Sequence, residues 1–197
     1  MRIQVVHAHP LSESYNAALY RKILGTLEAS GHEVAGTDLY AENFEPRMSA
    51  QERAAYFDPD PLRLPDTTPL IERLVWSEGL VFCFPHWWFD VPAILKGYFD
   101  RVWLPSVAFS PDRAGGRIRP ALTNIRKVAV VTSFGSPWWV VELFVRNPSR
   151  RTLKSGILMG CTGRVSFRYL AHYDMDRSTD TTRAAFMKRV EAEMRRF

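Results

Sequence analysis

Three largely apolar runs constrain the fold of this chain more than any other feature of its sequence. They are RIQVVHA at residues 2–8, GLVFCFP at 79–85 and KVAVVTS at 127–133. A continuous apolar run such as GLVFCFP is typical of a strand that is buried on both faces of a parallel sheet. We therefore expect a central sheet that is covered by helices on each side.

Two further strands are predicted around these runs. HEVAGTDLY follows Gly31, which suits a helix end, and forms a second strand ending at Asp38, while GRVSFRYL at 163–170 forms a fifth. Strands that alternate with helices form parallel sheets with right-handed crossovers, because parallel neighbours cannot be joined by hairpins. Helical spacing is found over 14–28, over 69–76, partly over 141–158 and in the charged, amphipathic stretch 179–196.

The helix expected after GLVFCFP has recognisable boundaries. Asp90 can cap its N-terminus, Pro92 lies in its first turn and Pro105 ends it. Earlier in the chain, residues 41–69 are polar and rich in proline, with one short helix around 49–56. We expect this long excursion to lie on the surface.

The composition fits one globular domain that occupies residues 1–197. Hydrophobic residues make up 46% of the chain and charged residues 24%, as in an ordinary folded domain. The N-terminal residues lack the long apolar segment of a signal peptide, and no apolar stretch approaches the ~20 residues needed to span a bilayer. A cytoplasmic protein that does not span the membrane is therefore expected.

The chain is basic, with a formal net charge of +5 that would attract anions such as nucleotide phosphates, nucleic acid or an anionic membrane. Much of the charge lies within residues 146–154 and in the C-terminal helix, where solvated helix faces are the simpler interpretation. Nucleic-acid binding is not expected, since no motif accompanies the charge. Cys83 and Cys161 form no C-x-x-C pair and are expected to be buried free thiols.

Ligands of an open parallel sheet bind beyond the carboxyl ends of its strands, where the strand order reverses. Three segments follow predicted strands at such ends. They are HAHPLSESYN at 7–16, FPHWWFDVP at 84–92 and TSFGSPWW at 132–139.

The first segment opens a helix, whose unpaired N–H groups and positive dipole end form an anion site. Ser12, Ser14 and Asn16 can add side-chain donors, although Ser14 acting only as a helix cap explains its presence equally well. The chain has neither a G-x-G-x-x-G nor a G-x-x-x-x-G-K-[ST] motif. His7 and His9 share a strand face, but no third ligand is evident and no metal site is expected.

The second segment concentrates aromatic residues at the mouth of a buried strand. Trp87, Trp88 and Phe89 follow Pro85 and His86. Exposing such side chains together is unfavourable unless they cover something flat, and stacking on a planar heteroaromatic ring is one such use. The alternative is that at least one of the three packs into the core or a subunit contact.

The third segment combines the small hydroxyl residues Thr132 and Ser133 with Gly135 and is followed by Trp138 and Trp139. Such a backbone suits the edge of a ring. The same composition is common in ordinary turns, so this segment alone indicates little.

Together, these segments resemble the NAD(P)H:quinone oxidoreductases of the flavodoxin-like fold, which include quinone reductases and flavoproteins associated with potassium efflux systems. The resemblance covers most of the chain and rests on AHPLSESYN, DLYAENFEP, FPHWWFDVPAILKGYFDRV and LKSGILMGCTG. It implies an α/β, doubly wound, five-stranded parallel sheet with helices on both faces and a bound FMN or FAD. It also implies a homodimer with the active site at the subunit contact, and two-electron ping-pong transfer from NADPH or NADH to a quinone.

The resemblance also implies roles for individual residues. Those that would bind the flavin are His9, Ser14, Tyr15, Asn16, Pro85, His86, Trp87, Trp88, Phe89, Thr132, Ser133 and Gly135. Phe109 would face the pocket that nicotinamide and acceptor occupy in turn, and Trp138 would occupy some of the space that a downstream Tyr and His fill in quinone reductases. Quinone reductases carry glycine where Phe134 stands, and the Tyr and His that stabilise their reduced flavin are missing downstream. No catalytic side chain is therefore assigned.

Two alternatives stay open at the level of the sequence. The first is a regulatory flavoprotein subunit of a membrane potassium efflux transporter, which the resemblance and the basic surface both allow. The second is a one-electron flavodoxin carrier, although such carriers are usually acidic. The length of the chain favours FMN over FAD.

Overall fold

The five predicted strands form one parallel sheet. The structure, a computed structural model of the chain, describes residues 1–58, 64–110 and 118–197. Its sheet has the order β2-β1-β3-β6-β7, which is that of a flavodoxin-like doubly wound fold, and every neighbouring pair is parallel. The strands are β1 (Arg2–His7), β2 (Glu33–Asp38), β3 (Gly79–Pro85), β6 (Lys127–Ser133) and β7 (Ser166–His172).

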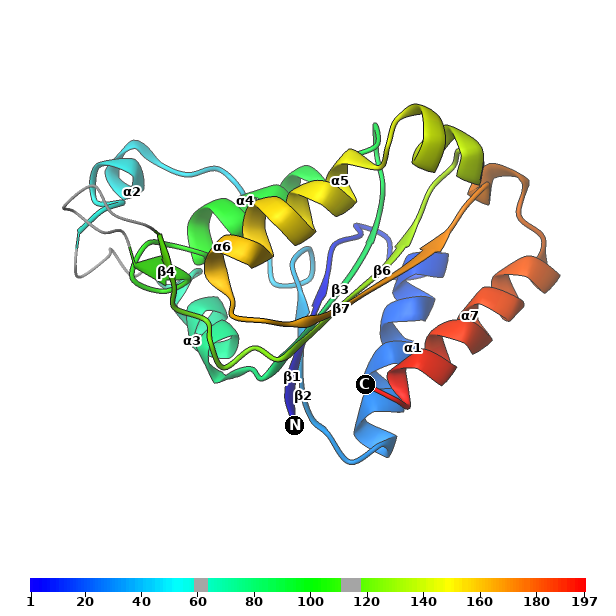
Figure 1. Cartoon of the computed structure of the whole chain (residues 1–197), viewed down its shortest axis with the longest axis horizontal. Coiled ribbons are helices and arrows are strands. Elements are labelled where there is room, and N and C mark those ends of the chain that lie inside the picture. The colour runs from blue at the N-terminus through cyan, green and yellow to red at the C-terminus, as the bar shows by residue number, and fades with distance from the viewer. Residues whose placement is uncertain (59–63, 111–117) are drawn as a thin grey trace.

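Helices cover both faces of this sheet, as Figure 1 shows. Two of them, α1 (Tyr15–Ala29) and α7 (Asp180–Met194), lie side by side on one face. The opposite face is covered by α3 (Thr68–Trp76), α4 (Ala93–Val102), and the segment that contains α5 (Pro148–Arg151) and α6 (Met159–Cys161).

Strand β3 contains no polar residue because its side chains are buried on both faces of the sheet. Val81 and Cys83 belong to the core beneath α1 and α7, whereas Leu80, Phe82 and Phe84 belong to the larger core on the opposite face. All seven residues of the strand are buried. Both sides of the pleat therefore require apolar side chains, which removes the alternation of a half-exposed strand.

Local signals set the ends of the two helices on the first face. The Ser14 hydroxyl accepts a hydrogen bond from the Ala17 N–H at 3.0 Å, and Gly31 follows the end of α1 with a φ of +81°. Helix α7 buries Phe186, Val190 and Met194, which are spaced four residues apart and form one face. The prediction of an amphipathic C-terminal helix is therefore confirmed.

Other boundaries differ from those predicted. Asp90 does not cap α4, because the helix begins at Ala93 after Pro92, and the Asp90 carboxylate instead accepts from the Val91 N–H at 2.8 Å. The fifth strand begins at Ser166 rather than at residue 163, since its pairing with β6 starts only there. A small antiparallel pair, β4 (Phe109–Ser110) with β5 (Arg119–Pro120), was not predicted.

The mixed region after β6 is helical but irregular. It begins with a π-helical turn, η1, closed by a hydrogen bond from the Val145 N–H to the Val140 carbonyl at 2.9 Å. Such wide turns are rare and are frequently found at functional sites. The bounds are η1 (Val140–Phe144) and η2 (Thr152–Leu158), with α5 between them and α6 after them.

One buried arginine fastens the excursion between β2 and α3 to the body of the protein. Arg101 of α4 is 3% exposed, and its guanidinium donates to Glu52 and to Asp66 at 2.7 Å each and to the Glu45 carbonyl. Glu52 belongs to the short helix α2 (Ala50–Ala54), which confirms the helix predicted there. The excursion is thus held by charge on α4, although its residues 59–63 lie outside the described part.

Two expectations drawn from composition concern the cysteines and the membrane. Cys83 and Cys161 are both buried and free, as predicted. Among the described residues, no helix is both long enough and apolar enough to cross a bilayer.

Replacing Arg101 with methionine should lower the free energy of unfolding by about 3 kcal/mol, because two carboxylates would lose their buried partner. Urea denaturation measures this loss. Limited proteolysis should show faster cleavage within the excursion. Arg47→Met, which removes an exposed partner of Glu45, should leave the unfolding midpoint unchanged. Equal midpoints for the two variants would contradict the role given to Arg101.

Candidate functional site

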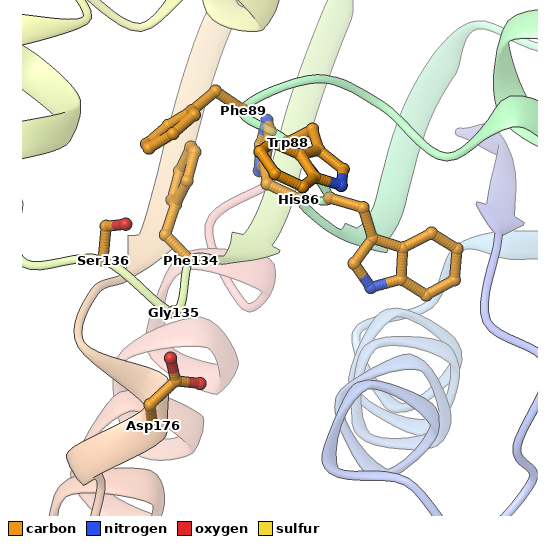
Figure 2. Close-up of a pocket in the computed structure, with 8 residues that line it drawn as sticks. His86, Trp88, Phe89, Phe134, Gly135, Ser136 and Asp176 are labelled. Carbon is orange, nitrogen blue, oxygen red and sulfur yellow. The ribbon is translucent and has the colours of Figure 1, made fainter.

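A pocket of about 520 Å³ lies at the carboxyl ends of β3 and β6, within the range of small-molecule sites. Figure 2 shows it in close-up, with Trp88 and Phe89 above Phe134 and with Asp176 below Gly135. The structure thus brings the second and third predicted segments together at one edge of the sheet. The lining residues are His86, Trp87, Trp88, Phe89, Phe134, Gly135, Ser136 and Asp176.

The aromatic segment forms a tight turn with an unusual backbone. Trp87 and Asp90 exchange two backbone hydrogen bonds of 3.2 and 3.1 Å, and the two residues between them have φ values of +53° (Trp88) and +62° (Phe89). Positive φ at both central positions is the pattern of a type I′ turn, which favours Asn and Gly. Large side chains in this conformation cost about 1 kcal/mol or more each. Strain of this kind points to a functional role.

The turn also holds its largest side chain in the solvent. Trp88 is 94% exposed, whereas Phe89 is half-buried against Phe134 and its neighbours. An indole in this position buries little apolar surface in the protein itself, so its contribution to stability does not explain its presence. A flat group that lies beneath it would provide the missing contact.

His86 forms the buried wall of the pocket in a defined tautomer. The Thr132 hydroxyl donates its proton to the Phe84 carbonyl at 2.6 Å, so the 2.7 Å contact between Thr132 Oγ1 and His86 Nδ1 requires the proton on Nδ1. His86 Nε2 is then free to accept from the Ser149 hydroxyl. Burial lowers the pKa of His86 to about 3, and the ring is neutral at physiological pH.

Phe134 lies at the centre of a stack of three rings. The centroid of its ring lies 3.8 Å from that of His86 and 5.6 Å from that of Tyr173, and the interplanar angles are 10° and 8°. The Tyr173 hydroxyl donates to Glu142 at 2.7 Å, as does the Asn147 amide. The residue that departs from the quinone reductase pattern is therefore a packed wall of this pocket.

The residues of the first segment lie beside the pocket rather than in its lining. Ser14 is the N-cap of α1, His9 Nδ1 accepts from the Leu11 N–H at 3.0 Å, and the Tyr15 hydroxyl donates to the Arg183 carbonyl. Asn16 is buried, and its Nδ2 has no hydrogen-bond partner among the described residues. A buried amide N–H group without a partner costs about 1–3 kcal/mol, so the Nδ2 of Asn16 is an exception to the pairing of the core.

The third segment is buried at its start and reaches the pocket at Gly135. Thr132 and Ser133 are buried, and the Ser133 carbonyl accepts from the His86 N–H at 2.8 Å. The Thr132 hydroxyl is engaged inside the protein and the residue is completely buried, so its role toward a flavin stays a prediction. Gly135 lines the pocket, where a Cβ atom would come within 2.7 Å of the Asp176 carboxylate.

Phe109 and Trp138 are not among the residues that line the pocket. Phe109 lies in β4 and packs against the larger core, while Trp138 is exposed at the start of the η1 region. Pro85 is buried as the last residue of β3. The proposed roles of Phe109 and Trp138 toward a substrate, and that of Pro85 toward a flavin, stay predictions.

Sequence reasoning placed Ser136 in the third segment, but it missed Asp176 as a lining residue and Ser149 as the partner of His86. Asp176 follows β7 in the short helix η3 (Met175–Arg177), far from the predicted segments in sequence. The sequence pointed to Asp176 only through its position after the fifth strand, which ends at the same edge of the sheet as β3 and β6. Among the described residues, no three His, Cys, Asp or Glu side chains are grouped to hold a metal.

The family model for the flavodoxin-like fold matches residues 1–195 of the chain. The chain belongs to the flavodoxin-like fold family. The strand order, the pocket at the carboxyl edge and the resemblance noted from the sequence all agree with this membership.

Several proteins similar to this member of the flavodoxin-like fold family are named as oxidoreductases. An uncharacterized NAD(P)H oxidoreductase, YcaK of Escherichia coli, is 35% identical over 66% of this chain and 64% of its own length. NAD(P)H dehydrogenase [quinone] 1 of Cavia porcellus is 32% identical over 68% of this chain and 54% of its own. The chain thus spans about half to two thirds of these relatives.

A solved structure covers nearly the whole chain. The NAD(P)H:quinone oxidoreductase of Methanothermobacter marburgensis superposes with a TM-score of 0.86, at 26% identity, over 99% of this chain and 98% of that protein. The two share one architecture along their full lengths.

Replacing Trp88 with asparagine should raise the melting temperature by about 2–4 °C, since Asn tolerates positive φ and the indole buries little. Differential scanning calorimetry of the protein without added ligand measures this. Trp139 is a matched control, because it is also exposed but has an ordinary φ of −67°. Trp139→Asn should give no increase. A fall in melting temperature for Trp88→Asn would show that its backbone is not strained.

His86 should make the protein less stable as the pH falls from about 6.5 toward about 3. Within this window His86 is protonated in the unfolded chain but neutral in the folded protein. The free energy of unfolding therefore falls by up to about 1.4 kcal/mol per pH unit. His86→Gln should flatten this slope, whatever its stability at neutral pH. His32→Gln, at a less buried imidazole, should change it little. Urea unfolding between pH 4 and 7 distinguishes these results, and an unaltered slope in His86→Gln would refute the assignment.

Proposed function

We propose that this protein is a flavin-dependent NAD(P)H oxidoreductase that reduces quinones or similar small acceptors by two-electron ping-pong hydride transfer. The observation that carries the proposal is the strained aromatic turn at Trp88 and Phe89, which lies over a pocket at the carboxyl edge of the sheet. The names of the relatives support the same chemistry.

The residues present fit a flavin. Asn16 offers a buried amide without a partner near the N-terminus of α1, where the helix dipole favours a phosphate. Gly135 lines the pocket, and because a Cβ atom there would meet the Asp176 carboxylate, only glycine lets this backbone lie at the pocket edge beside Asp176. Trp88 and Phe89 supply aromatic faces. We assign Asn16, Gly135, Trp88 and Phe89, together with His9, Ser14, Thr132 and Ser133, to the binding of FMN or FAD.

A flavin held here supplies hydride chemistry, with NADPH or NADH as donor. The contribution of the chain is to orient the reactants, exclude water and set the electrostatics of the pocket. His86 stays neutral and donates a hydrogen bond from Nδ1 to Thr132, so it adds no positive charge to the wall. The exposed carboxylate of Asp176 is the acidic group of the lining. No side chain is assigned as a proton donor.

The proposal extends to the surroundings of the protein. We propose a cytoplasmic homodimer in which the second subunit completes the substrate side of the pocket, toward which Phe109 and Trp138 are assigned. Within the described residues and the named relatives, no observation supports a regulatory subunit of a transporter. We therefore propose the reductase function alone.

Purified protein should be yellow, and it should oxidise NADPH or NADH when a quinone is added. Mass spectrometry of the released cofactor distinguishes FMN from FAD. A colourless protein that also fails to bind added FMN and FAD would reject the proposal.

Asn16→Leu should weaken flavin affinity at least about tenfold, since a charge-assisted hydrogen bond is lost. The same change should stabilise the flavin-free protein by about 1 kcal/mol, because an unpaired buried amide is removed. Asn124 is the matched control, as its amide donates to the Val75 and Ser77 carbonyls. Asn124→Leu should destabilise the protein and leave flavin affinity unchanged. Fluorescence titration with FMN measures the affinities, and equal affinities in the two variants would exclude Asn16 from the site.

A further inference from the structure

Asp176 contributes a negative charge to a pocket whose other described lining residues are neutral. Those residues are aromatic or small, and burial lowers the pKa of His86 to about 3, so that its ring carries no charge at physiological pH. The chain as a whole has a formal net charge of +5. The charge of the pocket is therefore opposite in sign to that of the protein.

Two backbone hydrogen bonds fix the position of Asp176 at the pocket. The Asp174 N–H donates to the Ser136 carbonyl at 2.9 Å. The Met175 N–H donates to the Phe134 carbonyl, also at 2.9 Å. Both acceptors belong to the loop after β6, which lines the pocket. Helix η3 is thereby fastened to this loop, and Asp176 is held with it.

The side chain of Asp176 lies directly against Gly135. A Cβ atom at Gly135 would come within 2.7 Å of one carboxylate oxygen and 3.1 Å of the other. Figure 2 shows the carboxylate below Gly135, pointing toward the loop that carries this glycine. The absence of a side chain at Gly135 is therefore what allows the charge to reach this edge of the pocket.

The structure describes no cation that pairs with this carboxylate. Within residues 1–58, 64–110 and 118–197, Asp176 forms no ion pair and no side-chain hydrogen bond. The guanidinium of Arg183, at the start of α7, donates instead to Ser178 and Asp180. A ligand in the pocket therefore meets an uncompensated negative charge.

Such a charge distinguishes the two redox states of a flavin. The oxidised isoalloxazine ring is neutral, whereas the reduced ring is an anion once N1 has lost its proton, and a charge nearby tunes its electronics. Like charges a few ångströms apart repel more strongly in a protein than in water, because the effective dielectric constant is lower. A carboxylate at the ring thus weakens binding of the reduced form and alters that of the oxidised form much less.

Resting on the proposed function, we propose that Asp176 makes the pocket hold the reduced flavin less tightly than the oxidised flavin. The reduced cofactor is then a stronger reductant, because its oxidation relieves the repulsion. In the proposed reaction NAD(P)H gives up a hydride and leaves as NAD(P)⁺. The quinone takes up that hydride equivalent with one proton from water and becomes a hydroquinone. Asp176 favours the transfer to the quinone by its charge, and no proton passes through it.

The ratio of two dissociation constants tests this role without turnover. Oxidised and dithionite-reduced FMN are titrated into the protein without oxygen, in mildly alkaline buffer that keeps the reduced ring anionic. Asp176→Asn preserves the shape of the side chain, and it should tighten binding of reduced FMN about tenfold relative to oxidised FMN. By linkage, the midpoint potential of the bound flavin should rise by about 30 mV. FAD replaces FMN in these titrations if the purified protein contains FAD.

Asp174 provides a matched control. It carries the same charge two residues away, is not among the lining residues, and has a φ of +58°, which asparagine also accepts. Asp174→Asn should change the ratio by less than about twofold, because an exposed charge outside the pocket is screened. Asp176→Glu keeps the charge and should keep the ratio close to that of the wild type.

Salt provides a second test that requires no variant. Raising the ionic strength should tighten the binding of reduced FMN relative to oxidised FMN in the wild type, because the carboxylate is screened. Asp176→Asn should show a smaller response. This measurement decides the question even if a variant fails to fold.

The remaining outcomes separate this inference from the proposed function. Equal ratios for the wild type and Asp176→Asn, when both bind oxidised FMN, would overturn the inference, whether the carboxylate lies away from the ring or a second subunit neutralises it. An equal shift in Asp174→Asn would overturn it in favour of net charge. A protein that binds neither oxidised FMN nor oxidised FAD would reject the proposed function itself.

Discussion

Burial of both faces of the sheet is the constraint on which the rest of this structure depends. The central strands β1, β3 and β6 must supply side chains to two cores, as Phe82 and Cys83 do on successive positions of β3. The faces are thereby closed to ligands. What is left for chemistry is the carboxyl edge, where the loops after β3, β6 and β7 meet around one pocket.

At that edge the protein departs from the easiest local structure. The aromatic turn adopts a backbone suited to Asn and Gly, yet it is held by paired hydrogen bonds between Trp87 and Asp90. Behind it, the neutral His86 and the stacked Phe134 form a rigid wall. Local strain beside a tightly packed wall is typical of sites in which geometry is fixed before the ligand arrives.

The sequence predicted those parts that follow from hydrophobic pattern. The strands, their order of appearance and the amphipathic α7 all depend on which side chains must be buried, so their spacing could be interpreted directly. The aromatic segment was recognised as a site because so many large rings follow one strand. Its turn type could not be predicted, since Trp88 and Phe89 have no preference for positive φ.

Contacts between distant segments were beyond prediction for a different reason. Asp176 lies beside Gly135 because β7 and β6 end side by side, and Ser149 meets His86 because the segment after β6 packs against the end of the neighbouring β3. Neither residue belongs to a local pattern. The expected cap at Asp90 failed because the tight turn uses that residue for its own closure, which delays α4 until after Pro92. Tertiary structure overrode a sound local signal.

The two buried cysteines have a consequence for the quinone reduction proposed for this protein. Quinones react most readily with thiolates, and a thiol that stays protonated reacts slowly. Burial raises the pKa of Cys161 to about 11 and that of Cys83 further, so neither supplies a thiolate at neutral pH. In the proposed quinone reductase, thiols held protonated in this way would meet reactive acceptors repeatedly without covalent modification of the two cysteines.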